Sequence, residues 1–353
     1  MSKIIGPLII NIDSTTLQDK ERDLLSINAI GSVILFAHNY ISKNQVKNLI
    51  TEIKNINSEI LISVDHEGGR IQRFKDEFTI LPSFTSIGNI YDKDKSYAKD
   101  LAYHSGYIAA YELKSVGVDI NFSPVVDLTN ISSVLHDRTF SKDSSIVIDL
   151  ATKYIQGHID NGIIPVIKHY PGHGTIENDS HHELCICKHS RKEMEHHLNV
   201  FLSLSNNFNI PIMTSHIQFT EVCENPATTS ATWLKDIPSK YFRNKPFFIS
   251  DDIEMLGLSS YYCDISSFNI LDKVLSNGCS MAIITSMQKR SYVENKRSAE
   301  YIFDEYLSKL DQLSISKNHT KMICHDDIIY NKGTQSMYNN SINSISKFNE
   351  HSK

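Results

Sequence analysis

Hydrophobic residues fall into short continuous runs, separated by longer stretches in which apolar positions recur at helical spacing. The runs are apolar throughout rather than at alternate positions, which is typical of strands buried on both faces of a parallel sheet. Eight such runs occur in the chain: Leu8–Ile12, Ser32–Phe36, Leu61–Asp65, Asp119–Val125, Ile164–Tyr170, Ile210–His216, Pro246–Asp252 and Met281–Thr285.

The stretches between the runs predict helices. Ser42 is placed to cap a helix with Val46, Leu49, Ile50 and Ile53 on one stripe. Further helices are expected over Tyr97–Val116, over Ile146–Asp160, after a capping box of Ser190 and Glu193, and from a cap at Ser267 to Asn277.

Alternating strands and helices indicate a parallel α/β fold. Eight strands favour a closed (β/α)₈ TIM-type barrel in a single domain over an open, doubly wound sheet. We expect this domain to span residues 1–330. Residues 331–353 are polar and rich in Asn and Ser, and they are read as a terminal helix on the barrel or a frayed tail.

Composition narrows the class of protein. The 353 residues are 41% hydrophobic and 22% charged, which excludes a disordered chain. There are 35 Lys and Arg against 41 Asp and Glu, a formal charge of −6, and no basic run stands out. Nucleic acid and anionic membrane surfaces are therefore not expected as partners.

The start of the chain predicts a strand rather than a signal peptide, because its short apolar stretch is broken at Gly6-Pro7 and lacks a small-residue cleavage site. No apolar run approaches the ~18 residues of a spanning helix. The six cysteines are scattered apart from one C-x-C, which favours reduced thiols and a cytoplasmic location.

Ionisable residues stand at the ends of four of the predicted strands. A buried strand that ends in charge needs a reason, because an unpaired buried charge is costly. In (β/α)₈ enzymes the carboxyl ends of the strands share one face, and that face carries the chemistry. Each residue alone could be a cap or a salt bridge, but together they predict one polar pocket: Asp65, Lys168-His169, His216 and Asp251-Asp252.

The segment 171–189 is long for a connection inside a compact fold, and long loops of this kind tend to be functional. It carries His173, His181 and His182, and Asp179 precedes His181 by two residues. A carboxylate beside an imidazole fixes its tautomer and raises its pKa, which makes the ring a usable proton donor near neutrality.

Metal and nucleotide sites are weaker readings of the same residues. His169 and His173 are four apart, but Pro171-Gly172 breaks any helix that would bring them together on a metal. The glycines at Gly68-Gly69 fit neither GxxxxGK[ST] nor GxGxxG, and no GxSxG elbow occurs. We expect neither a metal nor another cofactor.

Five motifs in order carry a family resemblance: DHEGGRIQRF, SPVVD with HDRTF, KHYPGHGTIENDSH, MTSHIQF and FFISDDIEM. Over about residues 5–290 the chain resembles the single-domain β-N-acetylglucosaminidases of glycoside hydrolase family 3, bacterial cytosolic enzymes of peptidoglycan recycling. The resemblance implies a (β/α)₈ barrel, in agreement with the strand count.

The resemblance also implies a role for individual residues. Asp251 matches the nucleophile, His181 the general acid/base and Asp179 the partner of that histidine. His216 lies near the site in the same pattern. Five positions match those that hold the N-acetylglucosamine ring: Asp65, Arg73, Arg138, Lys168 and His169.

These roles imply a retaining exo-glycosidase that acts on small saccharides or muropeptides through a glycosyl-aspartate intermediate. A monomer is expected. Alternatives are a β-glucosidase or a phosphorylase of the same family, a zinc hydrolase, and a degenerate sugar-binding barrel without activity.

The chain departs from the family pattern at several positions, which leaves the aglycone side of the pocket open. His66 stands where glutamine is usual, and His38 where arginine is common. Lys245-Pro246 replaces a glycine before the seventh strand, and Ser280 replaces an acidic residue.

Overall fold

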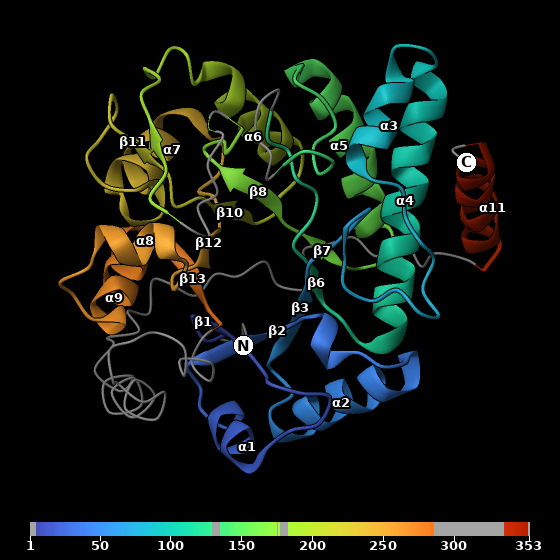
Figure 1. Cartoon of the computed structure of the whole chain (residues 1–353), viewed down its shortest axis with the longest axis horizontal. Helices are drawn as coiled ribbons and strands as arrows, with labels where there is room; N and C mark the ends of the chain where they lie inside the picture. The colour runs from blue at the N-terminus through green and yellow to red at the C-terminus, as the bar shows by residue number, and fades with distance from the viewer. Residues whose placement is uncertain (1–4, 129–134, 175, 177–182, 286–334, 352–353) are drawn as a thin grey trace.

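A computed structural model of the chain describes residues 5–128, 135–174, 176, 183–285 and 335–351. Nine of the described strand segments belong to one parallel sheet, and the other four form two separate two-stranded sheets. The parallel sheet curves into a barrel surrounded by helices, as Figure 1 shows. The strands are β1 Leu8–Asn11, β2 Ile30–Leu35, β3 Leu61–Val64, β4 His66–Gly68, β5 Ile71–Gln72, β6 Ile120–Asn121, β7 Ile164–Pro165, β8 Ile167–Tyr170, β9 Ile186–Cys187, β10 Ile212–Thr214, β11 Gln218–Phe219, β12 Phe248–Asp252 and β13 Cys279–Ile284.

The helices connect these strands along the outside of the barrel. Short 3₁₀ turns cover Ala37–Asn39 and Ala227–Thr229, and a π-helical turn covers Thr232–Asp236. The α-helices are α1 Asp19–Leu25, α2 Lys43–Ile56, α3 Phe84–Tyr91, α4 Lys95–Val116, α5 Ser144–Ile159, α6 Glu195–Asn207, α7 Ile237–Tyr241, α8 Leu256–Tyr261, α9 Ser267–Asn277 and α11 Gln335–His351.

The barrel closes through a single run of chain. The sheet order is β7-β6-β3-β2-β1-β13-β12-β10-β8, so its two ends are β7 and β8. Only Val166 separates these two strands, and the run Ile164–Tyr170 pairs at its start with β6 and at its end with β10. The nine segments therefore form eight barrel strands, because β7 and β8 are parts of one strand, and the predicted (β/α)₈ barrel is confirmed.

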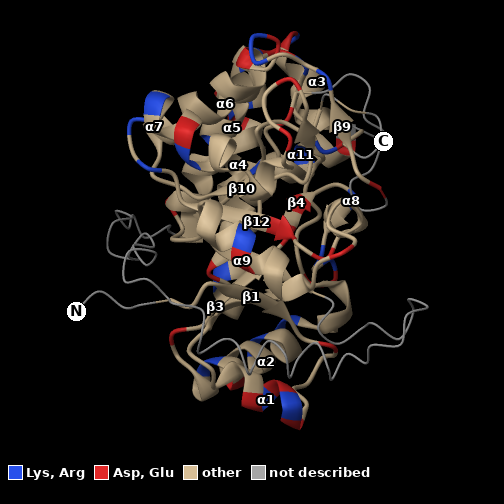
Figure 2. Ribbon diagram, turned by 90° about the vertical axis from the view of Figure 1, so that its left-hand side faces the viewer, with Lys and Arg blue, Asp and Glu red and all other residues tan. Residues whose placement is uncertain are grey.

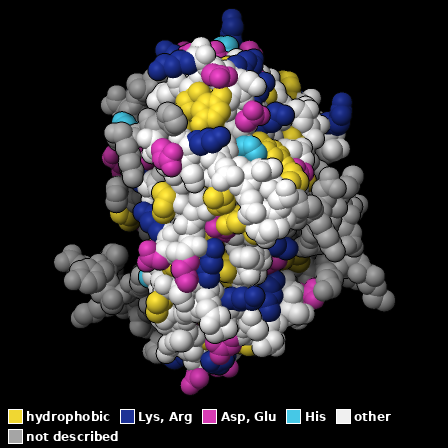
Figure 3. Space-filling model, turned by 90° about the vertical axis from the view of Figure 1, so that its right-hand side faces the viewer, with side chains coloured by type: hydrophobic (Ala, Val, Ile, Leu, Met, Phe, Trp, Pro, Cys, Tyr) yellow, Lys and Arg dark blue, Asp and Glu magenta, His cyan; other side chains and the backbone are white. Residues whose placement is uncertain are grey.

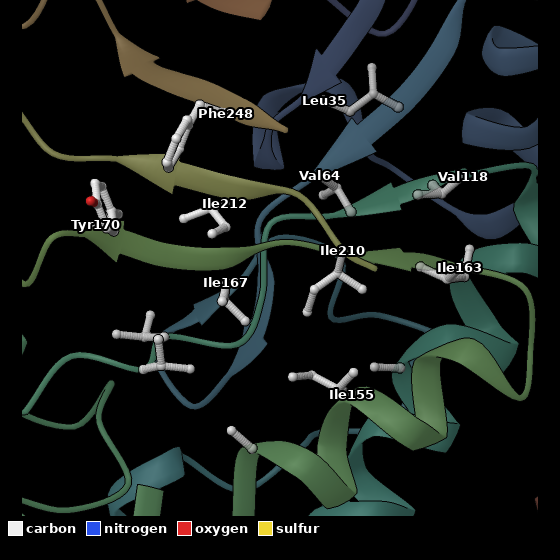
Figure 4. Packing of buried hydrophobic residues seen from close by; sticks show 14 of the residues in the cluster. Leu35, Val64, Val118, Ile155, Ile163, Ile167, Tyr170, Ile210, Ile212 and Phe248 are labelled. Carbon is white, nitrogen blue, oxygen red and sulfur yellow. The ribbon is translucent and has the colours of Figure 1, made fainter. Parts of the chain in front are cut away.

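Side chains are buried on both faces of the barrel strands, as the continuous hydrophobicity of these strands predicts. Ile9, Ile34, Met213 and Ile283 belong to the cluster that fills the barrel. Their neighbours along the strands point outward and pack under the helices. Figure 4 shows part of this outer layer, in which Ile155 of α5 faces the strands.

Several helix boundaries agree with the sequence pattern. The Ser42 side chain accepts a hydrogen bond from the Gln45 N–H and caps α2. Gly117 ends α4 with a φ of 98°, a conformation that glycine adopts without strain. The capping-box contacts of Ser190 and Glu193 are present, but regular helix begins only at Glu195.

Other element ends differ from the prediction, for example those of α5, which was expected over Ile146–Asp160 and covers Ser144–Ile159. Two further differences have a local cause. The cap of α9 is Ser266 rather than Ser267. The Ser266 hydroxyl accepts a hydrogen bond from the Asn269 N–H, and the helix begins at Ser267. The run Asp119–Val125 forms strand only at Ile120–Asn121, since Pro124 lacks a backbone N–H to extend the ladder.

The described part of 331–353 is helix α11, which lies along α4 (Figure 1). Within the described ranges, no helix is long and apolar enough to cross a membrane.

Candidate active site

The carboxyl ends of the barrel strands surround a cavity of about 490 Å³. Asp65 directly follows β3, Lys168 lies in β8, and Asp251 lies near the end of β12. The parallel order of the strands brings these three side chains, far apart in sequence, to one end of the barrel. The cavity lining joins them to apolar groups and to further polar groups: Ile34, Phe36, Arg70, Ile71, Arg73, Phe122, Arg138, His169, Met213, Asp252, Met255, Ile283 and Thr285.

Lys168 is the centre of a buried network of charges. Its Nζ lies 2.7 Å from Asp65 Oδ1 and 2.8 Å from Glu67 Oε1. The Lys168 side chain is only 2% exposed, and two carboxylates offset the cost of burying its charge. Burial favours a raised pKa for Asp65, but the charges of Lys168 and Arg73 outweigh it and lower the pKa.

Arg138 reaches the same network through Glu67. Its Nε and Nη2 donate to the two oxygens of Glu67, at 2.9 Å and 2.7 Å, in the two-pronged geometry that fits a guanidinium to a carboxylate. Burial opposes ionisation of Glu67, yet the attraction of Arg138 and Lys168 brings its pKa down to about 2. Glu67 is therefore a charged residue that fixes two of the cations predicted to hold the sugar.

His169 is oriented by a second buried carboxylate, Asp127. The His169 Nδ1 lies 2.8 Å from Asp127 Oδ2, and the His173 backbone N–H donates to Asp127 Oδ1 at 2.7 Å. Burial acts to raise the pKa of Asp127, but its bond with His169 and the other contacts lower it. An ionised Asp127 requires the proton on Nδ1, which in the neutral ring leaves Nε2 of His169 as a hydrogen-bond acceptor at the cavity.

Asp251 and Asp252 present two neighbouring carboxyl groups at the tip of β12. Asp251 Oδ1 accepts from the Asp252 N–H at 2.8 Å. The Asp252 carboxyl binds the Thr285 hydroxyl and the Glu254 N–H, and burial raises the pKa of Asp252 to about 7. Near neutral pH, Asp252 thus holds a proton part of the time, which reduces repulsion between the two groups.

His216 is just after the strand end where the sequence placed it, but it is not among the residues that line the cavity. Nε2 lies 2.8 Å from the Asp252 backbone oxygen, and Nδ1 lies 2.9 Å from Thr228 Oγ1. Because a carbonyl only accepts, Nε2 carries the proton in this contact. His216 therefore supports the end of β12 that carries Asp251.

The structure brings together most of the residues predicted from the sequence. The five residues predicted to hold the sugar ring and Asp251 line the cavity, and His216, the further candidate near the site, lies behind it. Asp179 and His181 lie outside the described residues, so their predicted roles stay predictions. Among the described residues, no group of three His, Cys, Asp or Glu side chains is arranged to hold a metal ion.

Sequence reasoning missed Glu67 and Asp127. Both stand in motifs that carried the family resemblance, DHEGGR and SPVVD. The available signal was their type: a carboxylate within two residues of a strand end, in a pocket with several expected cations, needs a cationic partner.

His66 and His38, two departures from the family pattern, lie near the site. His66 is fully buried against Phe74 and Phe78 and does not line the cavity. His38 stacks on the cavity residue Phe36 with ring centres 5.7 Å apart.

Comparison with known proteins places the chain in a family. Residues 5–320 match the glycosyl hydrolase family 3 N terminal domain. A beta-hexosaminidase from Nitrosomonas eutropha is 38% identical over 283 residues, which cover 79% of this chain and 80% of that protein. A beta-hexosaminidase from Hydrogenovibrio crunogenus is 38% identical over 260 residues, 73% of each chain.

A solved structure agrees with these relatives over nearly the whole chain. NagZ from Neisseria gonorrhoeae, in complex with N-trifluoroacetyl-D-glucosamine, superposes with a TM-score of 0.79 at 28% sequence identity, covering 98% of this chain and 99% of that one. With its barrel, its charged cavity and these matches, the chain belongs to glycosyl hydrolase family 3.

Proposed function

We propose that this chain is a retaining exo-β-N-acetylglucosaminidase that releases terminal N-acetylglucosamine from peptidoglycan fragments. The observation that carries the proposal is the position of Asp251: its carboxylate shares one cavity with the Asp65, Lys168 and Arg138 groups predicted to hold a sugar. The names of the beta-hexosaminidase relatives and the N-acylglucosamine bound to NagZ support the same substrate class.

The chemistry assigned to Asp251 is attack on the anomeric carbon of the bound sugar. The bond to the leaving oxygen breaks as the bond to Asp251 forms, and His181, oriented by Asp179, gives its proton to that oxygen. A water then loses a proton to His181 and displaces Asp251, which restores the enzyme and releases the sugar with its configuration retained.

The buried network has a defined task in this scheme. Charged donors and acceptors held in fixed positions bind sugar hydroxyls by charge-assisted bonds, each contributing about 1.5–3 kcal/mol. Because Lys168 and Arg138 are already fixed by Glu67, little ordering is left for substrate to impose on them. The setting we propose is peptidoglycan recycling in a bacterial cytoplasm, with an anhydro-muropeptide as substrate.

Replacement of Asp251 tests the proposal. Asp251→Ala removes the nucleophile, and we expect hydrolysis of a chromogenic β-N-acetylglucosaminide to fall by about 10³-fold or more. Asp264→Ala, which changes an exposed aspartate in the same part of the chain, is the matched control and should keep wild-type activity. Near-full activity in Asp251→Ala would end the proposal.

The same assay separates the enzymatic alternatives. Faster turnover of a β-glucoside would indicate a β-glucosidase, and release of a sugar 1-phosphate that depends on added phosphate would indicate a phosphorylase. Binding of N-acetylglucosamine without any turnover would leave a sugar-binding barrel.

A further inference from the structure

The C-terminal helix α11 packs antiparallel on α4, on the face of the molecule seen in Figure 3. Its first turn contacts the end of α4, where the rings of Tyr338 and Tyr111 stack with centres 4.3 Å apart. Farther along, Ser341 Oγ lies 2.9 Å from His104 Nδ1, and Ile345 is buried in the main core. The helix is thus held along its length.

One contact of α11 reaches a carboxylate inside the protein. The Tyr338 hydroxyl donates to Glu112 Oε1 at 2.9 Å. The Glu112 side chain is 4% exposed, and its carboxylate also accepts from the Thr79 hydroxyl and backbone N–H, at 3.1 Å and 2.9 Å. Burial, and then the charge of Glu112, raise the pKa of Tyr338 to about 12, so the phenol keeps its proton and remains a donor.

Thr79 belongs to the segment that carries a cavity residue. This segment runs from β5 through Arg73 to Leu81, and the side chain of Gln72 ties it together. Gln72 Nε2 donates to the backbone oxygens of Phe74 and Thr79, at 3.1 Å and 2.9 Å, and Gln72 Oε1 accepts from the Leu81 N–H at 3.0 Å. A displacement of Thr79 is therefore passed to the residues on either side of Arg73.

A second contact of α11 reaches the same segment. Asn349 Nδ2 donates to the Ile80 backbone oxygen at 3.3 Å. The helix thus contacts this segment at two points, directly at Ile80 and through Glu112 at Thr79. The two contacts come from opposite ends of α11, so the position of the segment depends on the docking of the whole helix.

Among Arg73, Arg138 and Lys168, Arg73 has the longest contact with a carboxylate. Its Nη2 lies 3.5 Å from Asp65 Oδ2, whereas Lys168 and Arg138 have carboxylate contacts at 2.7 Å. Its Nε is buried and has no hydrogen-bond partner among the described residues. The position of Arg73 is consequently set more by its backbone segment than by its carboxylate.

We infer that α11 positions the Arg73 segment through the Tyr338–Glu112–Thr79 contacts, and that Tyr338 is a positioning residue for sugar binding. The inference rests on the proposed function, because it takes Arg73 as a group that holds the sugar. Tyr338 acts on binding rather than on the chemical step, since none of these contacts involves Asp251.

The variant Tyr338→Phe removes the hydroxyl and keeps the stacked ring. We expect KM for a β-N-acetylglucosaminide to rise about threefold to tenfold while kcat changes less than about twofold, the pattern of lost binding that is common to substrate and transition state. Tyr111→Phe is the matched control: it removes a hydroxyl bonded to Gln335 in the same helix contact, and KM should not change.

A double variant distinguishes positioning from a general loss of stability. Thr79→Val removes the other hydroxyl on Glu112, and if both act on one path the combined rise in KM is smaller than the product of the single rises. Tyr338→Phe with a lower melting temperature and an unchanged KM would overturn the inference and leave α11 a structural helix.

Calorimetric binding of N-acetylglucosamine keeps the two proposals apart. If the wild type binds the sugar but does not turn over, the proposed function fails, and weaker binding by Tyr338→Phe still supports the inference. If the wild type turns over and Tyr338→Phe binds equally well, the inference alone fails. Absence of binding by the wild type overturns both.

Discussion

Glu67 is the residue on which two buried cations converge. Glu67→Gln keeps the size of the side chain but removes the charge that compensates Lys168 and Arg138. We expect a loss of about 3–5 kcal/mol in the free energy of unfolding, because removal of one partner leaves buried charge uncompensated. Urea unfolding measures this loss.

A matched control for Glu67 is an ion pair at the surface. Glu52→Gln breaks the exposed pair with Arg22, and pairs of this kind contribute about 1 kcal/mol or less. Equal losses in the two variants would contradict the role assigned to Glu67.

His66 predicts a dependence of stability on pH. Neither ring nitrogen has a hydrogen-bond partner among the described residues, and burial lowers the pKa of His66 to about 3. Between that value and the ordinary 6.5 the unfolded chain binds the proton and the folded chain does not, so stability falls as the pH drops through this range.

The variant His66→Gln cannot take up that proton. We expect its free energy of unfolding to fall less than that of the wild type between pH 6.5 and pH 4, with part of the slope retained because burial also lowers the pKa of His158. Urea unfolding at a series of pH values tests this, and parallel curves for the two proteins would contradict it.

At this scale the sequence predicted residue types and their common location, but not their partners. Asp65, Lys168 and Asp251 could be placed together because strand direction alone decides which end they share. The pairing of Glu67 with Arg138, and the contact of His216 with the Asp252 backbone, depend on side-chain direction and packing, which periodicity does not contain.

At the scale of elements, α4 and α5 approach closely at two glycines. A Cβ built on Gly106 would lie 2.2 Å from the Tyr154 backbone oxygen, and one on Gly157 would lie 2.5 Å from the Tyr107 nitrogen. These distances leave no room for a side chain, so the glycines set the separation of the two helices.

Gly106→Ala should therefore destabilise the protein even though alanine favours helix. Alanine gains about 1 kcal/mol in helix propensity, but forcing the helices apart costs typically 1–3 kcal/mol and here acts against backbone atoms. We expect a lower melting temperature, measured by calorimetry. Gly88→Ala tests the same effect on α3, where the Cβ would meet the Phe140 oxygen at 1.7 Å. A rise in stability in both variants would contradict this account of the helix contacts.

Element positions followed from the sequence more reliably than element ends. The cap at Ser42 and the end of α4 at Gly117 agree because one local contact fixes each. The start of α9 was misplaced by one residue because two adjacent serines offer the same cap, and only the wider fold selects Ser266.

At the scale of the whole molecule, charge is dispersed. Basic and acidic residues are spread over the ribbon rather than gathered on one face, as Figure 2 shows, and the formal charge is −6. Ionisable side chains gather instead at the cavity, which is lined by Asp65, Asp251, Asp252, Arg70, Arg73, Arg138 and Lys168. Glu67 pairs with Lys168 and Arg138, and Asp127 contacts His169.

The barrel strand Ile164–Tyr170, made up of β7 and β8, joins the two halves of the barrel and also carries Lys168. Both carboxylates that contact this lysine, Asp65 and Glu67, come from the N-terminal strands, while Asp251 comes from the C-terminal ones. A partly assembled barrel would lack part of the proposed sugar site, so recovery of enzymatic turnover after dilution from denaturant would report that the barrel has closed.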